Sequence, residues 1–332
     1  MPEPAKPVVK TKSRPFLKWA GGKFRLTDEI NRLFPKRKQC LVEPFVGAGA
    51  VFLNSNFKRY ILADINPDLI NLFNIVKQDV DAYILAAKPI FFHPEANTEN
   101  YYYAKRDEFN QSTNIFQRSV LFLYLNRFGF NGLCRYNSKN EFNVPFGDYK
   151  THYFPEEELR FFAAKAQSAV FICADFQQTF QMADENSVIY CDPPYAPLSQ
   201  DSNFTNYSGK LFSINHQQEL ATLAKHTTEQ RNIQVLISNH DTPFTREIYQ
   251  GAKIRRLKVQ RSISQSPHKR IKVRELIALF KTKNNPKIDR TFTLKIHWSY
   301  LTTLPDSARF LTRACIWLKI NKLKLFIKIV TI

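Results

Sequence analysis

Residues 187–195, Ser-Val-Ile-Tyr-Cys-Asp-Pro-Pro-Tyr, indicate both the fold and the site. Residues 188–191 have high strand propensity and predict a short buried strand, which the two prolines after Asp192 end because proline cannot donate to a ladder. In an open α/β sheet, ligands bind outside the carboxyl ends of the strands. The Asp192 carboxylate, the Pro193 carbonyl and the Tyr195 ring are therefore candidates to bind a planar group that carries an NH2. The alternative is a strand end with a proline turn, in which Asp192 only caps the next segment.

The composition predicts a large folded protein with a polyanionic partner. The chain has 332 residues, of which 44% are hydrophobic and 14% aromatic, enough for a large core and for two domains. Its formal net charge of +19 at pH 7 and its pI near 9.7 favour nucleic acid over an anionic membrane surface. A basic ribosomal or lipid-binding protein also fits the charge alone.

The cysteines and the N-terminus indicate a cytoplasmic protein. The five cysteines are odd in number and scattered, and most lie in apolar runs, which favours reduced core thiols over disulfides or a metal site. They are Cys40, Cys134, Cys173, Cys191 and Cys315. Residues 1–13 carry lysines and prolines but no apolar run, so we expect a disordered basic lead-in and not a signal peptide or a membrane anchor.

Two glycine segments predict close approach of the backbone to a ligand. Residues 21–23, Gly-Gly-Lys, precede a helical pattern, although such a pair more often makes only a turn. Residues 40–52 read as strand, glycine loop and helix, with Gly47 and Gly49 in the loop, and the next strand ends at Asp64. This spacing fits a Rossmann-like unit in which the carboxylate accepts from ribose hydroxyls. The glycine pattern is incomplete, which disfavours a dinucleotide, and an ordinary tight turn remains the alternative.

Several motifs in one consistent order resemble the Dam-type DNA adenine methyltransferases, which depend on S-adenosylmethionine. The likeness extends from about residue 14 to residue 281. The segments that carry it are residues 16–23, 43–49, 125–137, 142–147 and 192–195, together with Asp64.

The resemblance implies an α/β fold, a Rossmann-like methyltransferase sheet with an inserted helical DNA-recognition domain that carries a β-hairpin. The helical pattern after Asp64 is too long for one crossover, which supports an insertion. The expected parts are a catalytic domain that binds S-adenosylmethionine at 14–65 and 168–281, a target-recognition domain at 66–167, and an atypical C-terminal extension at 282–332.

The resemblance also assigns contacts with the cofactor. Phe45, Gly47 and Gly49 match the loop that packs against its methionine part. Asp64 matches the residue that holds the ribose hydroxyls. The other expected cofactor contacts are Trp19, Lys23, Asp175, Phe176 and Asp192.

Asp192, Pro193 and Tyr195 are the expected catalytic residues. A sulfonium methyl donor is already electrophilic, whereas an aromatic amine is a poor nucleophile. Hydrogen bonds from the amine to the Asp192 carboxylate and the Pro193 carbonyl would aim its lone pair and stabilise the positive charge that develops. The target base must leave the duplex, and stacking on Tyr195 would return part of that cost. No covalent intermediate is needed, so Cys191 is expected to pack in the core.

The end of the helical insertion combines side chains that can pair with base edges and rings that can wedge into a base stack. The alternative is an aromatic-rich helix and hairpin with a solvated polar face. By the resemblance, Arg135 reads a guanine of GATC, Leu133 and Pro145 touch the thymine, and Lys18 reads the first guanine. Phe130 stands where relatives usually have an intercalating Tyr. The full set of expected DNA contacts is Lys18, Arg127, Phe130, Asn131, Leu133, Arg135, Asn137 and Pro145.

After the catalytic turn, residues 203–207 form a polar and aromatic loop that could close over the base. Residues 253–263 and 272–280 read as a hairpin whose basic loop, residues 264–270, we assign to phosphate contacts, with a solvated basic edge as the alternative. Residues 282–332 do not fit the family. They could be an added DNA-binding or membrane-surface segment, but an accidental extension is at least as consistent, and no function is assigned to them.

Competing functions remain open at this point. A related enzyme could methylate cytosine, RNA or protein, and a catalytically inactive DNA-binding relative is possible, although the motif residues are present. We expect a monomer that acts on double-stranded DNA, uses neither metal nor membrane, and works in the bacterial cytoplasm with the nucleoid. The sequence does not separate a housekeeping role in replication-linked marking and mismatch repair from protection beside a restriction nuclease.

Overall fold

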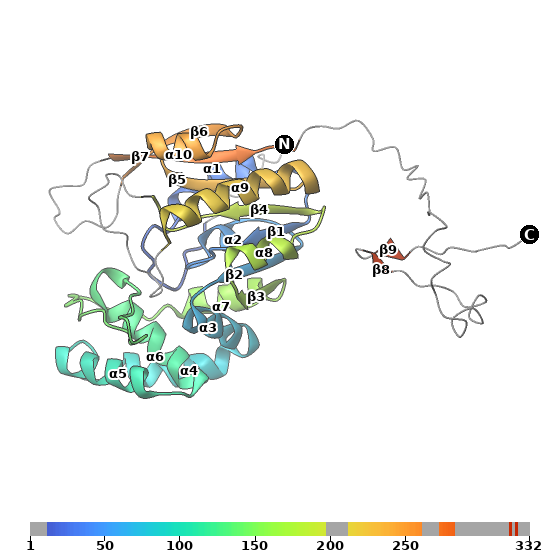
Figure 1. Ribbon diagram of the computed structural model, residues 1–332. Coiled ribbons are helices and arrows are strands. Elements are labelled where there is room, and N and C mark those ends of the chain that lie inside the picture. Colours follow the sequence, from blue (N-terminus) through green and yellow to red (C-terminus); the bar gives the residue numbers. More distant parts are fainter. Residues whose placement is uncertain (1–11, 197–211, 261–271, 283–318, 321–322, 325–332) are drawn as a thin grey trace, which may run out of the picture. The chain divides into compact units, whose positions relative to one another are not determined.

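The computed structural model describes residues 12–196, 212–260, 272–282, 319–320 and 323–324 (Figure 1). Its contacts divide the chain into two compact units, Met1–Lys283 and Asn284–Ile332. In the second unit, β8 (Lys319–Ile320) pairs antiparallel with β9 (Leu323–Lys324). The loops expected at 203–207 and 264–270, and most of the lead-in and of the extension, lie outside the described residues.

A seven-stranded sheet with the order β3-β2-β1-β4-β5-β7-β6 forms the centre of the first unit. Strands β1 to β5 run parallel, and β7 pairs antiparallel with both β5 and β6. The strands are β1 (Cys40–Glu43), β2 (Arg59–Asp64), β3 (Ala169–Cys173), β4 (Ser187–Cys191), β5 (Gln234–His240), β6 (Lys253–Gln260) and β7 (Lys272–Phe280). The predicted strand at 188–191 and the pairing of 253–263 with 272–280 are thereby confirmed over the described residues.

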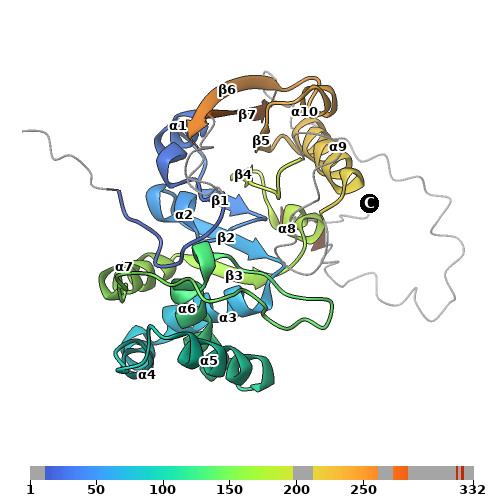
Figure 2. The same ribbon diagram turned by 90° about the vertical axis from the view of Figure 1, so that its left-hand side faces the viewer.

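The central strands are buried on both faces, as their uninterrupted apolar sequences require. In β1, Leu41 belongs to the same hydrophobic cluster as Phe52 of helix α2, whereas Val42 packs in the cluster that contains Leu220 of helix α9. The same alternation occurs in β4. Successive side chains of a strand point to opposite faces, so helices must cover both sides. Figure 2 shows α1 and α2 on one side of the sheet and α8 and α9 on the other.

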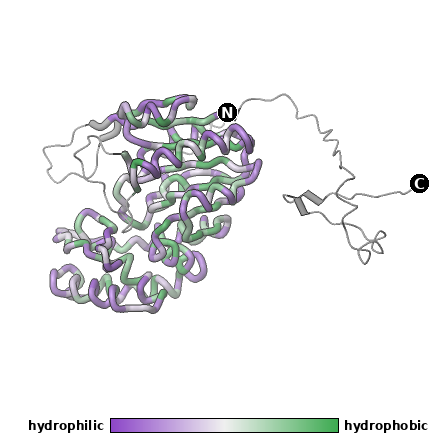
Figure 3. The backbone as a smooth tube through the Cα atoms, in the orientation of Figure 1, coloured by the Kyte–Doolittle hydropathy of each residue, from purple (hydrophilic) through white to green (hydrophobic). Residues whose placement is uncertain are grey.

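Twelve helical segments connect these strands in the described part of the chain. Both hydrophilic and hydrophobic residues occur along most of them, as expected for helices with one buried face (Figure 3). They are η1 (Phe24–Leu26), α1 (Thr27–Leu33), α2 (Ala50–Asn54), α3 (Pro67–Gln78), α4 (Val80–Phe91), α5 (Glu99–Gln111), α6 (Ile115–Phe128), η2 (Phe130–Gly132), α7 (Glu156–Ala166), α8 (Phe176–Met182), α9 (Ile214–Arg231) and α10 (Pro243–Ile248).

Of the helices between β2 and β3, α3 and α7 pack against β3, whereas α4, α5 and α6 form a layer further out beyond this edge of the sheet (Figures 1 and 2). Helix α6 is its centre and is buried on nearly every side, so its sequence shows almost no amphipathic pattern. A bidentate ion pair joins α3 to α6, with Arg118 Nε and Nη2 each 3.0 Å from an oxygen of Asp68. The helical character predicted for this insertion is confirmed, whereas its boundaries as a domain remain a prediction.

The segment after α6 folds back on itself without forming a continuous two-stranded ladder. It contains two isolated antiparallel bridges, Gly129 with Phe146 and Tyr136 with Phe142. Asn143 N–H also donates to the carbonyl of Arg135 at 3.0 Å. The expected β-hairpin is therefore not confirmed: the segment is an irregular paired loop, which we call the 129–147 loop.

One cysteine differs from expectation. Cys40, Cys134 and Cys191 are buried and free, in agreement with reduced core thiols, but Cys173 is free and exposed. Cys173 ends β3, which is the edge strand of the sheet among the described residues. Cys315 lies outside the described residues.

Candidate active site

The strand order reverses between β1 and β4, and in sheets of this kind ligands bind at the carboxyl ends of the two strands that flank the reversal. Asp192 follows β4 directly at this position. Its Oδ1 lies 3.1 Å from Lys23 Nζ, and the two side chains are 21% and 6% exposed. Asp192 Oδ1 is buried and accepts no hydrogen bond from the described residues, so the Lys23 ammonium serves it as an ion-pair partner without hydrogen-bond alignment. Burial raises the pKa of Asp192 to about 6, although the Lys23 charge acts to lower it.

The turn after Asp192 is held by side chains from β5 and α9. Gln217 Nε2 donates to the carbonyl of Pro194 at 2.7 Å, and Ala196 N–H donates to Asn239 Oδ1 at 3.0 Å. His240 Nδ1 lies 2.7 Å from the carbonyl of Ala196. These bonds fix the turn from outside, which stiffens it beyond the effect of its two prolines. Sequence reasoning assigned no role to Gln217 of α9 or to Asn239 of β5; the only signal was at Asn239, a polar residue near the end of an apolar strand.

The Tyr195 ring is oriented by three neighbours. Its hydroxyl donates to Glu275 Oε2 at 3.0 Å, and its edge-to-face contact with His240 has centroids 4.8 Å apart. Lys23 Nζ lies 4.7 Å from the ring centroid. The same ammonium therefore contacts both the carboxylate and the aromatic face that were predicted to bind an NH2 group.

The Pro193 carbonyl accepts no hydrogen bond from any part of the chain that the structure describes. Proline residues on both sides of the peptide provide no competing N–H at this turn. Together, Asp192 and Pro193 offer two acceptors beside an aromatic ring, which is the arrangement predicted from the sequence.

The glycine loop between β1 and α2 lies against Trp19. Gly47 has a φ of +47°, and a Cβ there would lie 2.9 Å from the indole nitrogen of Trp19. Gly47 N–H and Asn66 N–H each donate to the Asp64 carboxylate at 3.1 Å, one to each oxygen. Burial raises the pKa of Asp64 to about 6, while these N–H groups act to lower it. Asp64 is thus fixed at the end of β2 with spare lone pairs, a suitable acceptor for ribose hydroxyls.

An aromatic cluster stands beside this loop. Phe45 stacks on Phe176 with ring centroids 5.9 Å apart, and Phe212 makes edge contacts with both rings. Asp175 is engaged as the cap of α8, where its Oδ1 accepts from Gln178 N–H at 2.8 Å. Phe212 was not among the expected residues, because an isolated aromatic before a helix carries no distinctive signal.

Glu43 is a further group that sequence reasoning left out of the site. It ends β1, is 2% exposed, and its Oε1 accepts no hydrogen bond among the described residues. Burial, and next the Asp192 charge, raise its pKa well above the ordinary value. A buried acceptor with an unused oxygen at the switch point indicates room for a ligand donor, and the glycine, indole and carboxylate groups nearby fit the cofactor that the sequence predicted.

Two of the expected DNA-reading residues are held close to the sheet. Lys18 Nζ donates to the carbonyl of Arg127 at 2.8 Å and lies 3.6 Å from the Tyr149 ring centroid. Burial, and next the Arg127 charge, lower the pKa of Lys18 to about 8. Arg127 is itself largely enclosed, and burial lowers its pKa. Asn126, which the sequence did not single out, binds both the N–H and the carbonyl of Lys18 at 2.8 Å.

The other expected DNA-reading residues lie on the 129–147 loop. Arg135 and Pro145 are exposed, and Phe130 is 42% exposed. Asn137 is engaged within the loop tip, where Oδ1 accepts from Lys139 N–H and Glu141 N–H. Asn131 has a left-handed backbone with a φ of +54°, and Leu133 packs partly against the core.

A metal-binding cluster and a membrane-spanning helix are both absent from the part of the chain that the structure describes. Within residues 12–196 and the shorter described segments, no group of three or more acidic, histidine or cysteine side chains could hold a metal ion. None of the helices seen in this part of the chain is long and apolar enough to span a bilayer.

Residues 19–263 match the family described as D12 class N6 adenine-specific DNA methyltransferase. A DNA adenine methylase of Haemophilus influenzae is 73% identical over 271 residues, which cover 82% of this chain and 95% of the relative. Proteins of the same name in Escherichia coli K12 and Vibrio cholerae are 58% and 57% identical over 270 and 269 residues, covering 81% of this chain and 96% of each relative. A solved precorrin 8w decarboxylase, 12% identical with a TM-score of 0.37 over 82% of this chain and 100% of its own, supports no argument. The match over residues 19–263 shows that this chain belongs to the D12 class of N6 adenine-specific DNA methyltransferases.

Proposed function

We propose that this methyltransferase transfers a methyl group from S-adenosylmethionine to the N6 amine of an adenine flipped out of double-stranded DNA, within the sequence GATC. The observation that carries the proposal is the position of the Asp192 carboxylate: its Oδ1 lies 3.1 Å from Lys23 Nζ, and the same ammonium lies 4.7 Å from the Tyr195 ring centroid. An amine could replace this ammonium beside the carboxylate, and the base that carries the amine could stack on Tyr195.

The cofactor would lie against the carboxyl ends of β1 and β2. Asp64 would accept from its ribose hydroxyls, and Gly47 would allow the backbone and Trp19 to approach it closely. Phe45 and Phe176 would offer apolar faces to it. When bound, S-adenosylmethionine would supply an electrophilic methyl group on a sulfonium.

The catalytic turn would orient the target amine. Asp192 and the Pro193 carbonyl would each accept one N6 hydrogen, which directs the nitrogen lone pair away from the ring plane. As the N–C bond forms, these acceptors would stabilise the positive charge on N6, and Asp192 could take the proton that N6 then releases. Lys23 has to move from its contact with Asp192 before the amine can occupy that position.

DNA recognition would involve Lys18 and the 129–147 loop, with Arg127, Phe130, Asn131, Leu133, Arg135, Asn137 and Pro145 as the expected contacts. The net charge of +19 supports a polyanionic substrate. Because the relatives are bacterial and share one name, we place the activity in the bacterial cytoplasm, at the nucleoid. We also propose that the enzyme acts as a monomer. The assignment of 66–167 to target recognition is part of the same proposal.

A methylation assay with radiolabelled S-adenosylmethionine on GATC and scrambled duplexes tests the function. Asp192→Ala should reduce the single-turnover rate by about 10²–10³-fold, because one preorganised contact to the developing charge is lost. It should still bind the GATC duplex, and Asp192→Asn serves as the variant of matched shape. Methyl transfer by Asp192→Ala at the wild-type single-turnover rate would refute the role of this carboxylate, and labelling of cytosine or of scrambled DNA would refute the proposed substrate.

A further inference from the structure

Three side chains on one face of α5 bind the backbone of the 129–147 loop. Tyr102, Arg106 and Asn110 are spaced four residues apart, so the helix places them on the same side. Tyr102 Oη and Arg106 Nη1 both donate to the carbonyl of Val144, at 3.0 and 3.3 Å. Asn110 Nδ2 donates to the carbonyl of Phe142 at 3.1 Å, and Asn110 Oδ1 accepts from Phe142 N–H at 2.7 Å.

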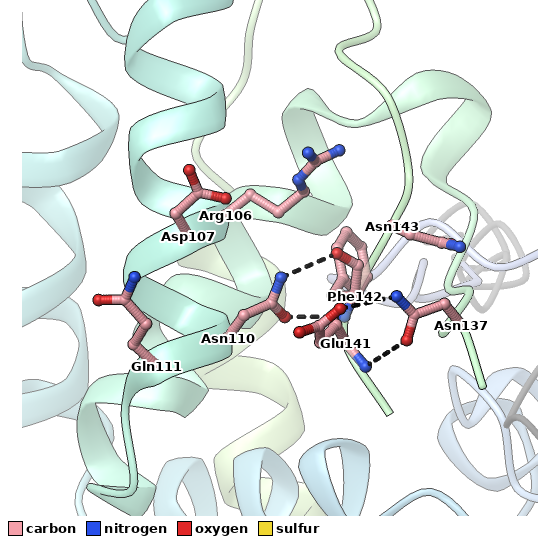
Figure 4. Close-up of a pocket in the computed structure, with 8 residues that line it drawn as sticks. All are labelled: Arg106, Asp107, Asn110, Gln111, Asn137, Glu141, Phe142 and Asn143. Carbon is pink, nitrogen blue, oxygen red and sulfur yellow. Dashed lines mark hydrogen bonds between the residues drawn. The ribbon is translucent and has the colours of Figure 1, made fainter. Parts of the chain in front are cut away.

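Figure 4 shows Asn110 pointing from α5 toward Phe142, with the two hydrogen bonds between these residues drawn as dashed lines. A single side-chain amide thus pairs with both polar groups of one residue, as the neighbouring strand of a ladder would. A cavity of about 270 Å³ opens beside this contact. Because the cavity leaves that side unpacked, hydrogen bonds rather than apolar contacts hold the Phe142 backbone there.

The residue between Phe142 and Val144 faces the opposite way and holds Arg135. Asn143 Oδ1 accepts from Arg135 Nε at 2.7 Å, and the Asn143 carbonyl accepts from Arg135 Nη2 at 2.9 Å. Asn143 N–H donates to the Arg135 carbonyl in return. These bonds use two of the five guanidinium N–H groups and leave three for a partner. The position of the exposed guanidinium therefore depends on the peptide that α5 binds from the other side.

We propose that Asn110 is a positioning residue for sequence recognition. Resting on the proposed function, the inference is that Asn110 fixes the Phe142 peptide, that this peptide fixes Asn143, and that Asn143 aims the Arg135 guanidinium at a base edge. A bidentate contact of arginine with guanine requires such aim, because both N–H groups must meet their acceptors at once. The side chain of Asn110 bonds to Phe142 and not to Arg135, so it acts on Arg135 only through the loop backbone.

Two features make the inference separable from a general loss of structure. The Phe142 ring is also anchored by edge contacts with Phe109 of α5 and Phe122 of α6, so the loop keeps its apolar attachment when the amide is removed. Lys18 is held by Asn126 of α6 and not by α5. Substitution of Asn110 should therefore lower discrimination at the base pair that Arg135 reads and leave discrimination unchanged at the base pair that Lys18 reads.

The experiment compares kcat/KM on the GATC duplex with kcat/KM on four duplexes that each carry one changed base pair. Asn110→Ala should lower discrimination about tenfold at the base pair where Arg135→Ala lowers it, and leave discrimination at the first base pair unchanged. In an Arg135→Ala background, Asn110→Ala should cause no further loss at that base pair, because the two act through one contact. Gln111→Ala is the matched control, since Gln111 is exposed in the same cavity and its side chain makes no hydrogen bond to another described residue.

Asn110→Asp keeps the acceptor for Phe142 N–H and loses the donor, so it should recover part of the discrimination and can replace Asn110→Ala if that variant does not fold. Unchanged discrimination in both Asn110 variants, or an equal loss at all four base pairs, would overturn the inference. Failure of the wild-type enzyme to prefer GATC would contradict the proposed function instead, so the two failures are distinguishable.

Discussion

At the scale of single residues, Lys23 is the residue whose observed contacts differ most from those expected from the sequence. It was expected to contact the cofactor, yet its ammonium lies 3.1 Å from Asp192 and 4.7 Å from the Tyr195 ring centroid. A cation at this position compensates a carboxylate that would otherwise be buried without a partner. Lys23 thus keeps Asp192 ionised in the absence of substrate, in the place where the target amine is proposed to bind.

The pH dependence of methyl transfer tests this role. Only the ionised carboxylate can accept from an NH2 group without donating, and burial raises the pKa of Asp192 to about 6. The kcat/KM for the duplex, which reports the enzyme before DNA binds, should therefore fall as the pH decreases through about 6. Lys23→Gln removes the charge that lowers this pKa, so the acid limb should move to higher pH.

Lys225→Gln is the matched control, because it removes the same charge from an exposed position on α9. Its pH profile should coincide with that of the wild type. An acid limb in Lys23→Gln that stays in place, or moves to lower pH, would contradict the assigned ion pair.

At the scale of elements, the loop between β1 and α2 owes its shape to both backbone conformation and close packing. Gly47 adopts a positive φ and its missing Cβ leaves space for the Trp19 indole. Gly251, which follows α10, also has a positive φ, of +91°, but a Cβ there would meet nothing within 4 Å. Comparing substitutions at the two glycines therefore separates the cost of a left-handed backbone from the effect of contact with the proposed cofactor site.

Alanine at each glycine gives the second test. Both Gly47→Ala and Gly251→Ala should lose about 1–2 kcal/mol of unfolding free energy from the left-handed backbone. Only Gly47→Ala should also weaken binding of S-adenosylmethionine, about tenfold or roughly 1.4 kcal/mol, because its Cβ displaces Trp19. Denaturant unfolding measures the loss of stability, and calorimetric titration measures the affinity for S-adenosylmethionine. Equal cofactor affinity in both variants would contradict the assignment of Trp19 to the cofactor site.

At the scale of the whole molecule, the excess of positive charge is partly exposed along β6. The side chains of Arg255 and Arg256 are 62% and 65% exposed, and each has one carboxylate at the long distance of 3.7 or 3.5 Å. Glu29, the partner of Arg255, is itself 34% exposed, and an exposed pair at such a distance contributes little to stability, so Arg255 could exchange its partner for a phosphate. The assignment of this hairpin to phosphate contacts remains a prediction, since its loop lies outside the described residues.

The salt dependence of binding tests that assignment. If Arg255 contacts a phosphate, Arg255→Gln should reduce the slope of log affinity against log salt by about 0.9, with GATC preference unchanged. Arg160→Gln is the comparison, because Arg160 of α7 is paired with both Asp81 and Glu156. Equal slopes for wild type and Arg255→Gln would favour a solvated basic edge that does not touch DNA.

The sequence by itself determined the elements and the chemistry that each one carries. Strand propensity and two prolines were enough to place Asp192 on a stiff turn, and the spacing of Gly47 and Asp64 was enough to predict the loop and the strand end beside it. These signals are local, because propensity, turn formation and backbone freedom depend on a few neighbouring residues. The resemblance to the family, which the comparisons confirmed, rests on the same local motifs.

Only the tertiary structure decided which distant groups meet at these elements. The contact of Lys23 with Asp192, the bond from Tyr195 to Glu275 and the binding of Phe142 by Asn110 each join separate parts of the chain. Such contacts follow from the strand order, which brings the ends of β1, β4 and β5 to one edge, and from the packing of α5 against the 129–147 loop. A single sequence shows no local preference for them, because a long-range contact stabilises a side chain only after the backbone has brought its partner near.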